Sequence, residues 1–363
     1  MRLAVRELLR RPGRFSVAGG ALTLIVVLLL LLGGLLDGLY LGSTGLYRQQ
    51  AADLVVYSSD ARESILRSRI GGEVRGAIEG VDGVDAVRGL GLALVGARVP
   101  GSQEIADAAV VGYEGGIAGV PDPPSPGEAY ADRRLEASGV ATGDVLELGP
   151  GRVPVEVVDW VDDVSYLQQG ALLVEPGTWR QVLASARPDA TLAEEAFQVL
   201  VVDVEGEAGD VAAAIDEATA GGTSTLDLDA AISALPGVDA QTTTFNQIIV
   251  VTFFVAGLVV ALFFAFVTLE RSAQYGVLKA IGASSSQIYL GLVTQAIAVT
   301  AGAFLLGAAV SLGIARVVPA GIPLQLEPSR AAFVAVGMFL TALAGGSISL
   351  RRVVRIDPAS AVG

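Results

Sequence analysis

Four long apolar stretches constrain the fold of this chain more than any other feature. They lie at residues 15–41, 247–269, 288–318 and 331–350. Each holds about 20 or more mostly uncharged residues, which is the length that a helix needs to cross the roughly 30 Å hydrocarbon layer of a bilayer. With a mean hydropathy of +0.59, the chain is also too apolar for an ordinary soluble protein. The sequence therefore predicts an α-helical membrane protein with four transmembrane helices.

A large domain of soluble composition separates the first span from the second, at residues 42–246. Two strand-like runs, ADLVVYSSD (52–60) and FQVLVVDVE (197–205), each precede a helical stretch. Those stretches close with the related phrases IEGVDGVDA and ISALPGVDA. The pattern predicts an α+β unit made of two strand-helix-strand halves and split by an insertion; chance similarity of two turns is the alternative.

The insertion, at about 95–190, contains short strand-like runs separated by glycine and proline. VPDPPSPGE and DVLELGPGRVPVEVVDW are typical of it. We predict a small β-rich subdomain there. Its polar residues, including Asp162, Asp163 and Tyr166, have no spacing that indicates a metal or catalytic site, and we expect the acid pair to lie in a solvated loop.

The distribution of charge predicts the orientation of the chain. Residues 1–14, 270–287 and 351–363 carry ten basic and three acidic side chains, whereas 42–246 carries 12 basic and 33 acidic ones. Basic residues close to span ends stay in the cytoplasm. We therefore expect both termini inside, and the domain at 42–246 and the short loop at 319–330 outside. An acidic outer domain also argues against nucleic acid as a partner.

Missing residue types exclude several classes of chemistry. The chain has no cysteine and no histidine, so it lacks disulfides, the commonest general base and the commonest transition-metal ligand. A cleaved signal peptide is the alternative to the first span, but the apolar stretch is too long and no A-x-A pattern follows it. The one lysine, Lys279, follows Leu278 rather than a glycine, so no P-loop is present.

The segment ERSAQYGVLKAIGAS, residues 270–284, directly follows the second span. Tyr275, Leu278 and Ile281 recur near helical spacing and predict a short amphipathic helix on the cytoplasmic side. Gly282 is placed to end it. Such a helix docks in a groove of a partner or rests on lipid headgroups, and the spacing alone fits both.

This segment resembles the signature of the FtsX/MacB-type permeases, or type VII ABC transporters, of the four-helix MacB, LolC and HrtB kind. Their phrase is similar to E-R-x-x-E-x-G-x-L-[RK]-A-I-G-A. Matching positions are Glu270, Arg271, Gly276, Leu278, Lys279, Ala280, Ile281, Gly282 and Ala283. Gln274 departs from the usual acid. ELLRRPGRFS near the N-terminus, residues 126–149 and RIDPASAV near the C-terminus are also similar to the family.

The resemblance implies a function for the chain and a role for the segment. The segment would be a coupling helix that enters a cleft in a separate ABC ATPase, with two ATPase copies serving a homodimer of this chain. Its ATPase-coupling residues would be Glu270, Arg271, Tyr275, Gly276, Leu278, Lys279, Ile281 and Gly282. ATP and Mg²⁺ would bind the ATPase, and this non-catalytic subunit would bind no cofactor. The outer domain would resemble a porter-like split α+β unit with an inserted β subdomain.

The family implies mechanotransmission in a bacterial plasma membrane. ATP-driven motion of the coupling helices would move the outer domain and expel or extract a hydrophobic or amphiphilic compound, with an extracytoplasmic adaptor as a possible partner. An FtsX-like signalling subunit that activates a cell-wall hydrolase is the alternative. A membrane-anchored extracellular enzyme is a third interpretation, which no nucleophile-base pattern supports.

Two features of the first span stand apart from the coupling segment. Gly34, Gly38 and Gly42 recur every four residues and form a stripe that permits close helix approach, either to a second copy or within the chain. Asp37 lies inside the span, where an acid marks a functional site by default. Its distance from Arg14, about 35 Å along a helix, predicts a solvated outer helix end instead.

Overall fold

The computed structural model describes residues 12–101, 105–190, 192–193, 195–270, 274, 277, 281–319 and 321–354. The chain divides into two compact units. One comprises Met1–Gly38 with Gln241–Gly363, and the other is Leu39–Ala240. The first unit holds the long apolar helices. The second overlaps the domain expected at 42–246, and we call it the outer domain after the side of the membrane that the sequence predicts for it.

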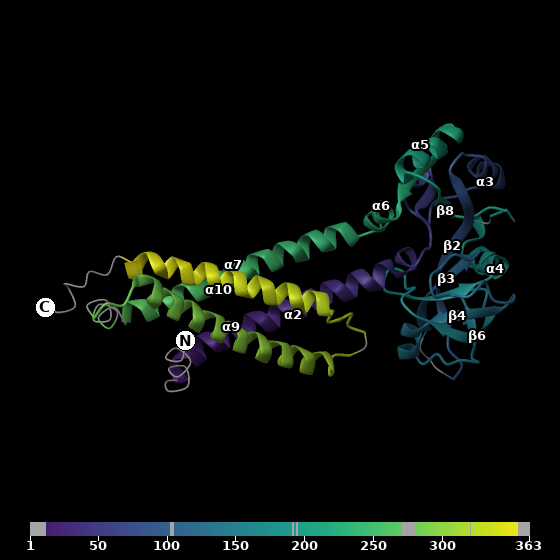
Figure 1. Cartoon of the computed structure of the whole chain (residues 1–363). Helices are drawn as coiled ribbons and strands as arrows, with labels where there is room; N and C mark the ends of the chain where they lie inside the picture. The colour runs from purple at the N-terminus through teal and green to yellow at the C-terminus, as the bar shows by residue number, and fades with distance from the viewer. Residues whose placement is uncertain are drawn as a thin grey trace. The chain divides into compact units, whose positions relative to one another are not determined.

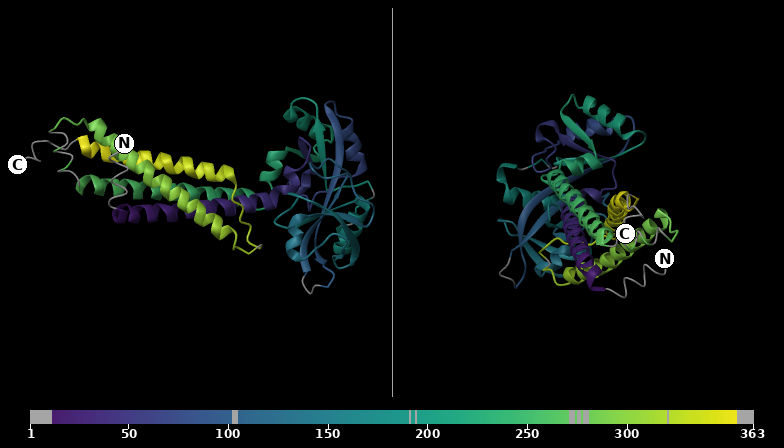
Figure 2. Two further views of the ribbon diagram at one scale, coloured as in Figure 1. Left: turned by 60° about the horizontal axis from the view of Figure 1, so that its bottom comes forward. Right: turned by 90° about the vertical axis from the view of Figure 1, so that its left-hand side faces the viewer.

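Four long helices run side by side in the first unit (Figures 1 and 2). They are α2 (Pro12–Arg48), α7 (Val238–Glu270), α9 (Ser285–Ala315) and α10 (Pro328–Val354). Their shared core is made of apolar side chains that are almost fully buried, among them Val26, Leu29, Ala256 and Met338. Apolar side chains also cover much of the outer face of α7, including Phe254, Leu258 and Leu262. Exposure of this kind fits helices that lie in lipid.

Three described helices are long and apolar enough to cross a membrane. The candidate spans are Ala18–Arg48, Val238–Phe263 and Ser286–Ala315. The apolar described part of α10, Pro328–Ala344, is shorter. The first three predicted spans are therefore supported, and the fourth, at 331–350, stays a prediction.

The outer domain begins and ends with two strand-helix-strand halves. The first is β1 (Leu54–Ser58), α3 (Gly72–Glu79) and β2 (Val84–Arg98); the second is β8 (Val199–Val204), α5 (Ala208–Ala218) and β9 (Thr223–Asp227). Their strands lie in the order β2-β8-β1-β9, all antiparallel. The two halves thus interleave in one sheet, as expected of a split α+β unit.

The residues between these halves form a closed circuit of strands. It uses β3 (Ile105–Tyr113), β4 (Glu128–Asp132), β5 (Val145–Leu148), β6 (Val153–Val161) and β7 (Gly170–Val174). Hydrogen bonding runs β2-β3-β7-β4-β6-β5 and returns to β2. Closure leaves no free edge in this six-strand circuit.

The insertion is therefore not a separate sheet. Strand β2 is 15 residues long and belongs to both parts. It pairs with β8 over Val84–Leu90 and with β3 over Leu90–Arg98. The expected boundary at residue 95 falls inside this strand, because a run of alternating residues does not reveal where a strand changes partners.

Shorter helices complete the outer domain. They are α4 (Pro176–Ala186) and α6 (Leu228–Ser233), with single 3₁₀ turns at Ser59–Ala61, Arg133–Ser138 and Pro188–Ala190. Figure 1 shows α3 and α5 near β8 and α4 near β3. Helix α4 is well capped, since Glu175 accepts hydrogen bonds from the backbone N–H groups of Gly177 and Thr178.

Glycines in β2 and β3 make room for the largest core side chains. The Trp179 ring lies against Gly91 and Gly112, and the Phe197 ring lies against Gly89. The two rings stack with centroids 5.8 Å apart and an interplanar angle of 5°, and both are almost fully buried. A Cβ atom at any of these glycines would overlap a ring.

We predict that Gly91→Val destabilises the outer domain by about 1–3 kcal/mol, because overpacking shifts a ring that has no free space. The measurement is the thermal unfolding midpoint of the full chain in detergent, followed by tryptophan fluorescence. Gly209→Val is the matched control, since no atom lies near the Cβ position of Gly209. Equal midpoints for the two variants would contradict the packing argument.

Candidate functional site

The site that the sequence singles out lies between α7, which ends at Glu270, and α9, which begins at Ser285. Gln274 and Val277 are helical, and the Ile281 N–H donates to the Val277 carbonyl at 3.1 Å. Val277 is 49% exposed and Ile281 is 76% exposed. Residues four apart share one face of a helix. Among the described residues of the segment, Val277 and Ile281 thus present two uncovered apolar side chains, which we call the apolar face.

A defined turn ends this helical segment. Gly282 adopts a φ of +100°, a left-handed conformation that favours glycine at a helix end. Two residues later Ser284 caps α9 reciprocally with Gln287. The Ser284 hydroxyl accepts from the Gln287 N–H at 3.2 Å, and the Gln287 side chain accepts from the Ser284 N–H at 3.1 Å. Ile281 is therefore followed directly by a defined turn and a capped helix start.

The structure places only part of the predicted coupling set. Glu270 is the last residue of α7, Ile281 is exposed, and Gly282 ends the helical segment, as expected of it. The other five positions lie outside the described residues: Arg271, Tyr275, Gly276, Leu278 and Lys279. Their role in coupling stays a prediction.

The glycine stripe of α2 faces the chain itself. The Gln325 N–H donates to the Gly34 carbonyl at 2.9 Å, and a Cβ at Gly38 would overlap the Pro323 carbonyl. Both contacts come from the loop between α9 and α10. Gly42 lies against the side chains of Arg134 and Gln168. Internal packing therefore occupies each glycine, and contact with a second copy stays a prediction.

Asp37 differs from the solvated helix end that its position predicts. Its carboxylate forms a two-point ion pair with Arg330 at the start of α10, with Nε–Oδ2 at 3.0 Å. The Asp37 side chain is only 15% exposed and that of Arg330 is 22% exposed. The partner is 293 residues away in sequence, so no local pattern reveals it.

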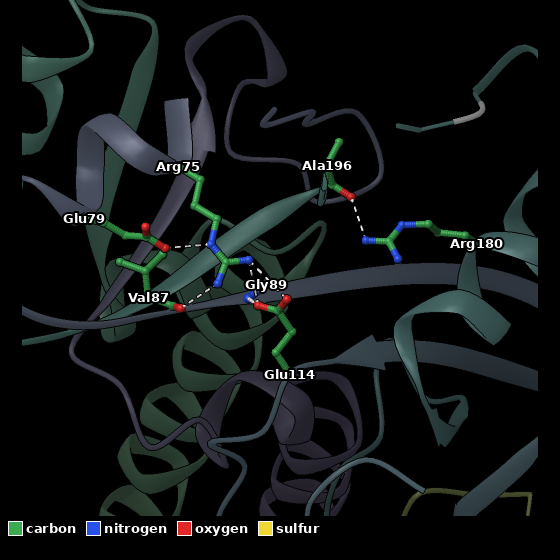
Figure 3. Close-up of polar contacts among 7 residues, drawn as sticks. All are labelled: Arg75, Glu79, Val87, Gly89, Glu114, Arg180 and Ala196. Atoms are coloured by element: carbon green, nitrogen blue, oxygen red, sulfur yellow. Dashed lines mark hydrogen bonds and ion pairs between the residues drawn. The ribbon is translucent and has the colours of Figure 1, made fainter. Parts of the chain in front are cut away.

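A second ion-pair cluster lies in the outer domain (Figure 3). The Arg75 guanidinium contacts Glu79 at 2.9 Å and Glu114 at 2.9 Å, and it donates to the Val87 carbonyl at 3.0 Å. Glu114 also accepts from the Gly89 N–H at 2.7 Å. The cluster ties α3 to β2 and to the end of β3. Only the helical spacing of Arg75 and Glu79 could have signalled it, since Glu114 is distant in sequence.

This cluster lines a shallow depression of about 350 Å³, which Glu195 and Phe197 also border. The charges of Arg75 and Glu114 already satisfy one another, so they are structural ties rather than reactive groups. Among the residues that the structure describes, no group of three or more acidic side chains could hold a metal ion.

The polar loop of the insertion is only partly solvated. Asp162 pairs at the surface with Arg133 at 2.9 Å. Tyr166, in contrast, is 2% exposed and packs on Tyr47 with ring centroids 6.3 Å apart. Burial raises the pKa of Tyr166 to about 12. Asp162 and Asp163 are both exposed, as expected of a solvated loop, whereas Tyr166 belongs to the core.

Comparison with known proteins assigns the C-terminal region. Residues 246–358 match the family described as FtsX-like permease C-terminal, and this confirms the resemblance drawn from the sequence. A putative hemin transport system permease protein HrtB of Staphylococcus epidermidis is 25% identical over 142 residues, which cover 39% of this chain and 41% of that protein. An uncharacterized ABC transporter permease of Mycobacterium tuberculosis is 37% identical over 116 residues, covering 31% and 32%. The matched segments thus span less than half of these relatives.

Two solved structures are similar to the outer part of the chain. The extracellular domain of the noncanonic ABC-type transporter YknZ from Gram-positive bacteria shares 15% identity with a TM-score of 0.33, covering 48% of this chain and 98% of that one. The periplasmic region of MacB from Actinobacillus actinomycetemcomitans shares 10% identity with a TM-score of 0.36, covering 51% and 92%. At these scores neither likeness establishes a shared mechanism.

We predict that Asp37→Asn destabilises the helical unit by about 1–3 kcal/mol, because it leaves the Arg330 charge partly buried without its partner. The double variant Asp37→Asn/Arg330→Gln is expected to recover part of the loss. Thermal unfolding in detergent, read by helical circular dichroism, measures both. The single variant Arg330→Gln completes the comparison. A loss of stability in the double variant that equals or exceeds the summed losses of the two single variants would contradict the pairing.

Proposed function

Because residues 246–358 match the FtsX-like permease family, we propose that this chain is the membrane subunit of an ABC transporter in a bacterial plasma membrane. The observation that carries the proposal is the exposed apolar face at Val277 and Ile281, ended by Gly282 and continuous with α7 and α9. A soluble partner that pushes on this segment acts directly on two long helices.

The proposed partner is an ABC ATPase that receives this segment in a groove. An amphipathic helix docks by its apolar face, and a glycine at its end lets the partner backbone approach closely. The remaining signature residues, Glu270, Arg271 and Lys279 among them, would supply the polar contacts at the rim. Two ATPase copies would bind ATP and Mg²⁺, and two copies of this non-catalytic chain would hold them.

The proposed orientation places both termini and residues 270–287 in the cytoplasm. It rests on the ten basic side chains of the inner segments and the 33 acidic ones of 42–246. ATP-driven displacement of the coupling segments would then reach a domain on the opposite side of the membrane. The output is expulsion or extraction of a hydrophobic or amphiphilic compound.

The first test is purification of the chain from native membranes in mild detergent, with identification of what accompanies it. We expect an ABC ATPase with the parent chain and a loss of at least about tenfold with Ile281→Glu, since an added charge must be desolvated in an apolar groove. Val317→Glu is the control, because Val317 is 79% exposed and Ile281 is 76% exposed. An ATPase retained by Ile281→Glu would refute the docking face.

The class of substrate is tested on the purified complex in lipid nanodiscs. Transport of an amphiphile predicts that at least one, haem among those tried, changes ATP turnover by about twofold or more, because a bound substrate shifts the conformational equilibrium. Haem is included because the relative from S. epidermidis is named as a putative hemin transport permease. Turnover indifferent to every amphiphile, with a cell-wall hydrolase crosslinked to 42–246, would favour the signalling alternative.

A further inference from the structure

The last turns of helix α2 are built into the outer domain. Residues from Leu39 onward belong to that compact unit, although α2 continues without interruption from Pro12 to Arg48. Ser43, Thr44, Leu46 and Tyr47 are all buried. A helix that crosses the membrane thus ends as a core element of the sheet domain.

The contacts come from residues 163–168, which we call the joint loop and which connects β6 to β7. The Leu46 N–H donates to the Ser165 carbonyl at 3.0 Å. In the reverse direction, the Leu167 N–H donates to the Ser43 carbonyl at 3.2 Å and the Gln168 N–H donates to the Gly42 carbonyl at 2.9 Å. Main-chain bonds in both directions fix the loop to the helix in one register.

Side chains reinforce this attachment. The Gln168 amide donates to the Leu39 carbonyl at 2.6 Å and to the Ser43 hydroxyl at 3.0 Å. Tyr166 packs on Tyr47 of the helix. At the other end of the loop, buried Asp132 of β4 accepts from the Val164 N–H at 3.0 Å. The loop is therefore anchored to the helix on one side and to the six-strand circuit on the other.

The loop holds a backbone shape that would not persist without such contacts. Asp163, Leu167 and Gln168 have φ values of 57°, 46° and 69°, in a region that residues with side chains rarely adopt. Gly45 meets this backbone directly, since a Cβ there would lie 2.5 Å from the Asp163 carbonyl oxygen. The helix and the loop approach as closely as glycine allows.

Helix α7 is attached to the outer domain in a different way. It follows α6 through a short turn that contains Gly237, with a φ of +83°. Val238 is buried in the domain core, but the side chains over residues 239–248 are exposed or half-buried. In α2, by comparison, residues 42–47 are all buried.

We propose that the joint loop fixes α2 to the six-strand circuit, so that displacement of α2 reaches the outer domain through residues 163–168. The inference rests on the proposed function only for the source of the displacement. The joint itself is a property of this chain without nucleotide or ATPase.

Hydrogen exchange of the full chain in phosphatidylethanolamine–phosphatidylglycerol nanodiscs tests the attachment. We expect amides of the joint loop to exchange about tenfold or more slowly than those of the exposed turn at 206–208. Gly45→Leu should accelerate them about tenfold while β4, β6 and β7 keep their protection. Gly19→Leu, in the same helix with open space at its Cβ position, should change nothing.

The exchange result has clear contrary outcomes. Joint-loop amides as fast as the exposed turn in the parent chain would overturn the proposal, and so would unchanged protection in a folded Gly45→Leu variant. If Gly45→Leu unfolds the strands, Gln168→Ala takes its place, because it removes the two hydrogen bonds that the Gln168 side chain donates to Leu39 and Ser43. That variant should still accelerate exchange of the loop several-fold, and no acceleration would count against the joint.

Distances between spin labels test the consequence for motion. The chain has no cysteine, so spin labels attach only at the two introduced sites, Tyr40→Cys of α2 and Asp107→Cys of β3. We expect a narrow distance distribution that Gly45→Leu broadens and that a two-glycine insertion after Gly237 leaves unchanged. An insertion that broadens the distribution as much as Gly45→Leu would overturn the proposal. Neither measurement involves the ATPase, so failure of the proposed function would be seen separately, in the purification.

Discussion

The organisation of this protein depends on helix α2, which must be stable both in lipid and in a water-exposed domain. In a bilayer core every backbone polar group has to bond within its own helix, and α2 meets that demand with a long uncharged run. At its outer end the same helix enters a water-exposed sheet domain, where loop residues supply bonds that lipid cannot. The joint with residues 163–168 and the glycines that permit it follow from this change of surroundings, because only a residue without a side chain lets two backbones approach so closely.

The helical unit also depends on glycines that allow two backbones to approach closely. Gly34 and Gly38 accommodate the loop between α9 and α10, and the ion pair of Asp37 with Arg330 lies on the same side of α2. An acid inside a predicted span is thereby neutralised by a partner on another helix, as expected where a lone charge would be costly. Gly34, Gly38 and Asp37, which look like separate features in the sequence, thus serve one intrachain contact.

Much of this arrangement could be predicted from the sequence, and the rest could not for physical reasons. Apolar length revealed three spans, and Gly282 indicated the helix end that its φ displays, because both signals are local. The six-strand circuit was not predicted, since strand partners are set by contacts between distant residues. Asp37 gave no hint of Arg330 for the same reason. The acidic neighbours of Tyr166 gave no sign that its ring lies in the core against Tyr47.

The proposed function depends on docking of an ABC ATPase at the apolar face beside Gly282. A photo-crosslinking amino acid placed at Val277, which is 49% exposed, tests this most directly in native membranes. On illumination we expect a covalent adduct with an ABC ATPase, identified by mass spectrometry. We expect no such adduct when the same group replaces Val317. Adducts with lipid alone at position 277 would contradict docking of an ATPase and would indicate a helix that rests on the membrane surface.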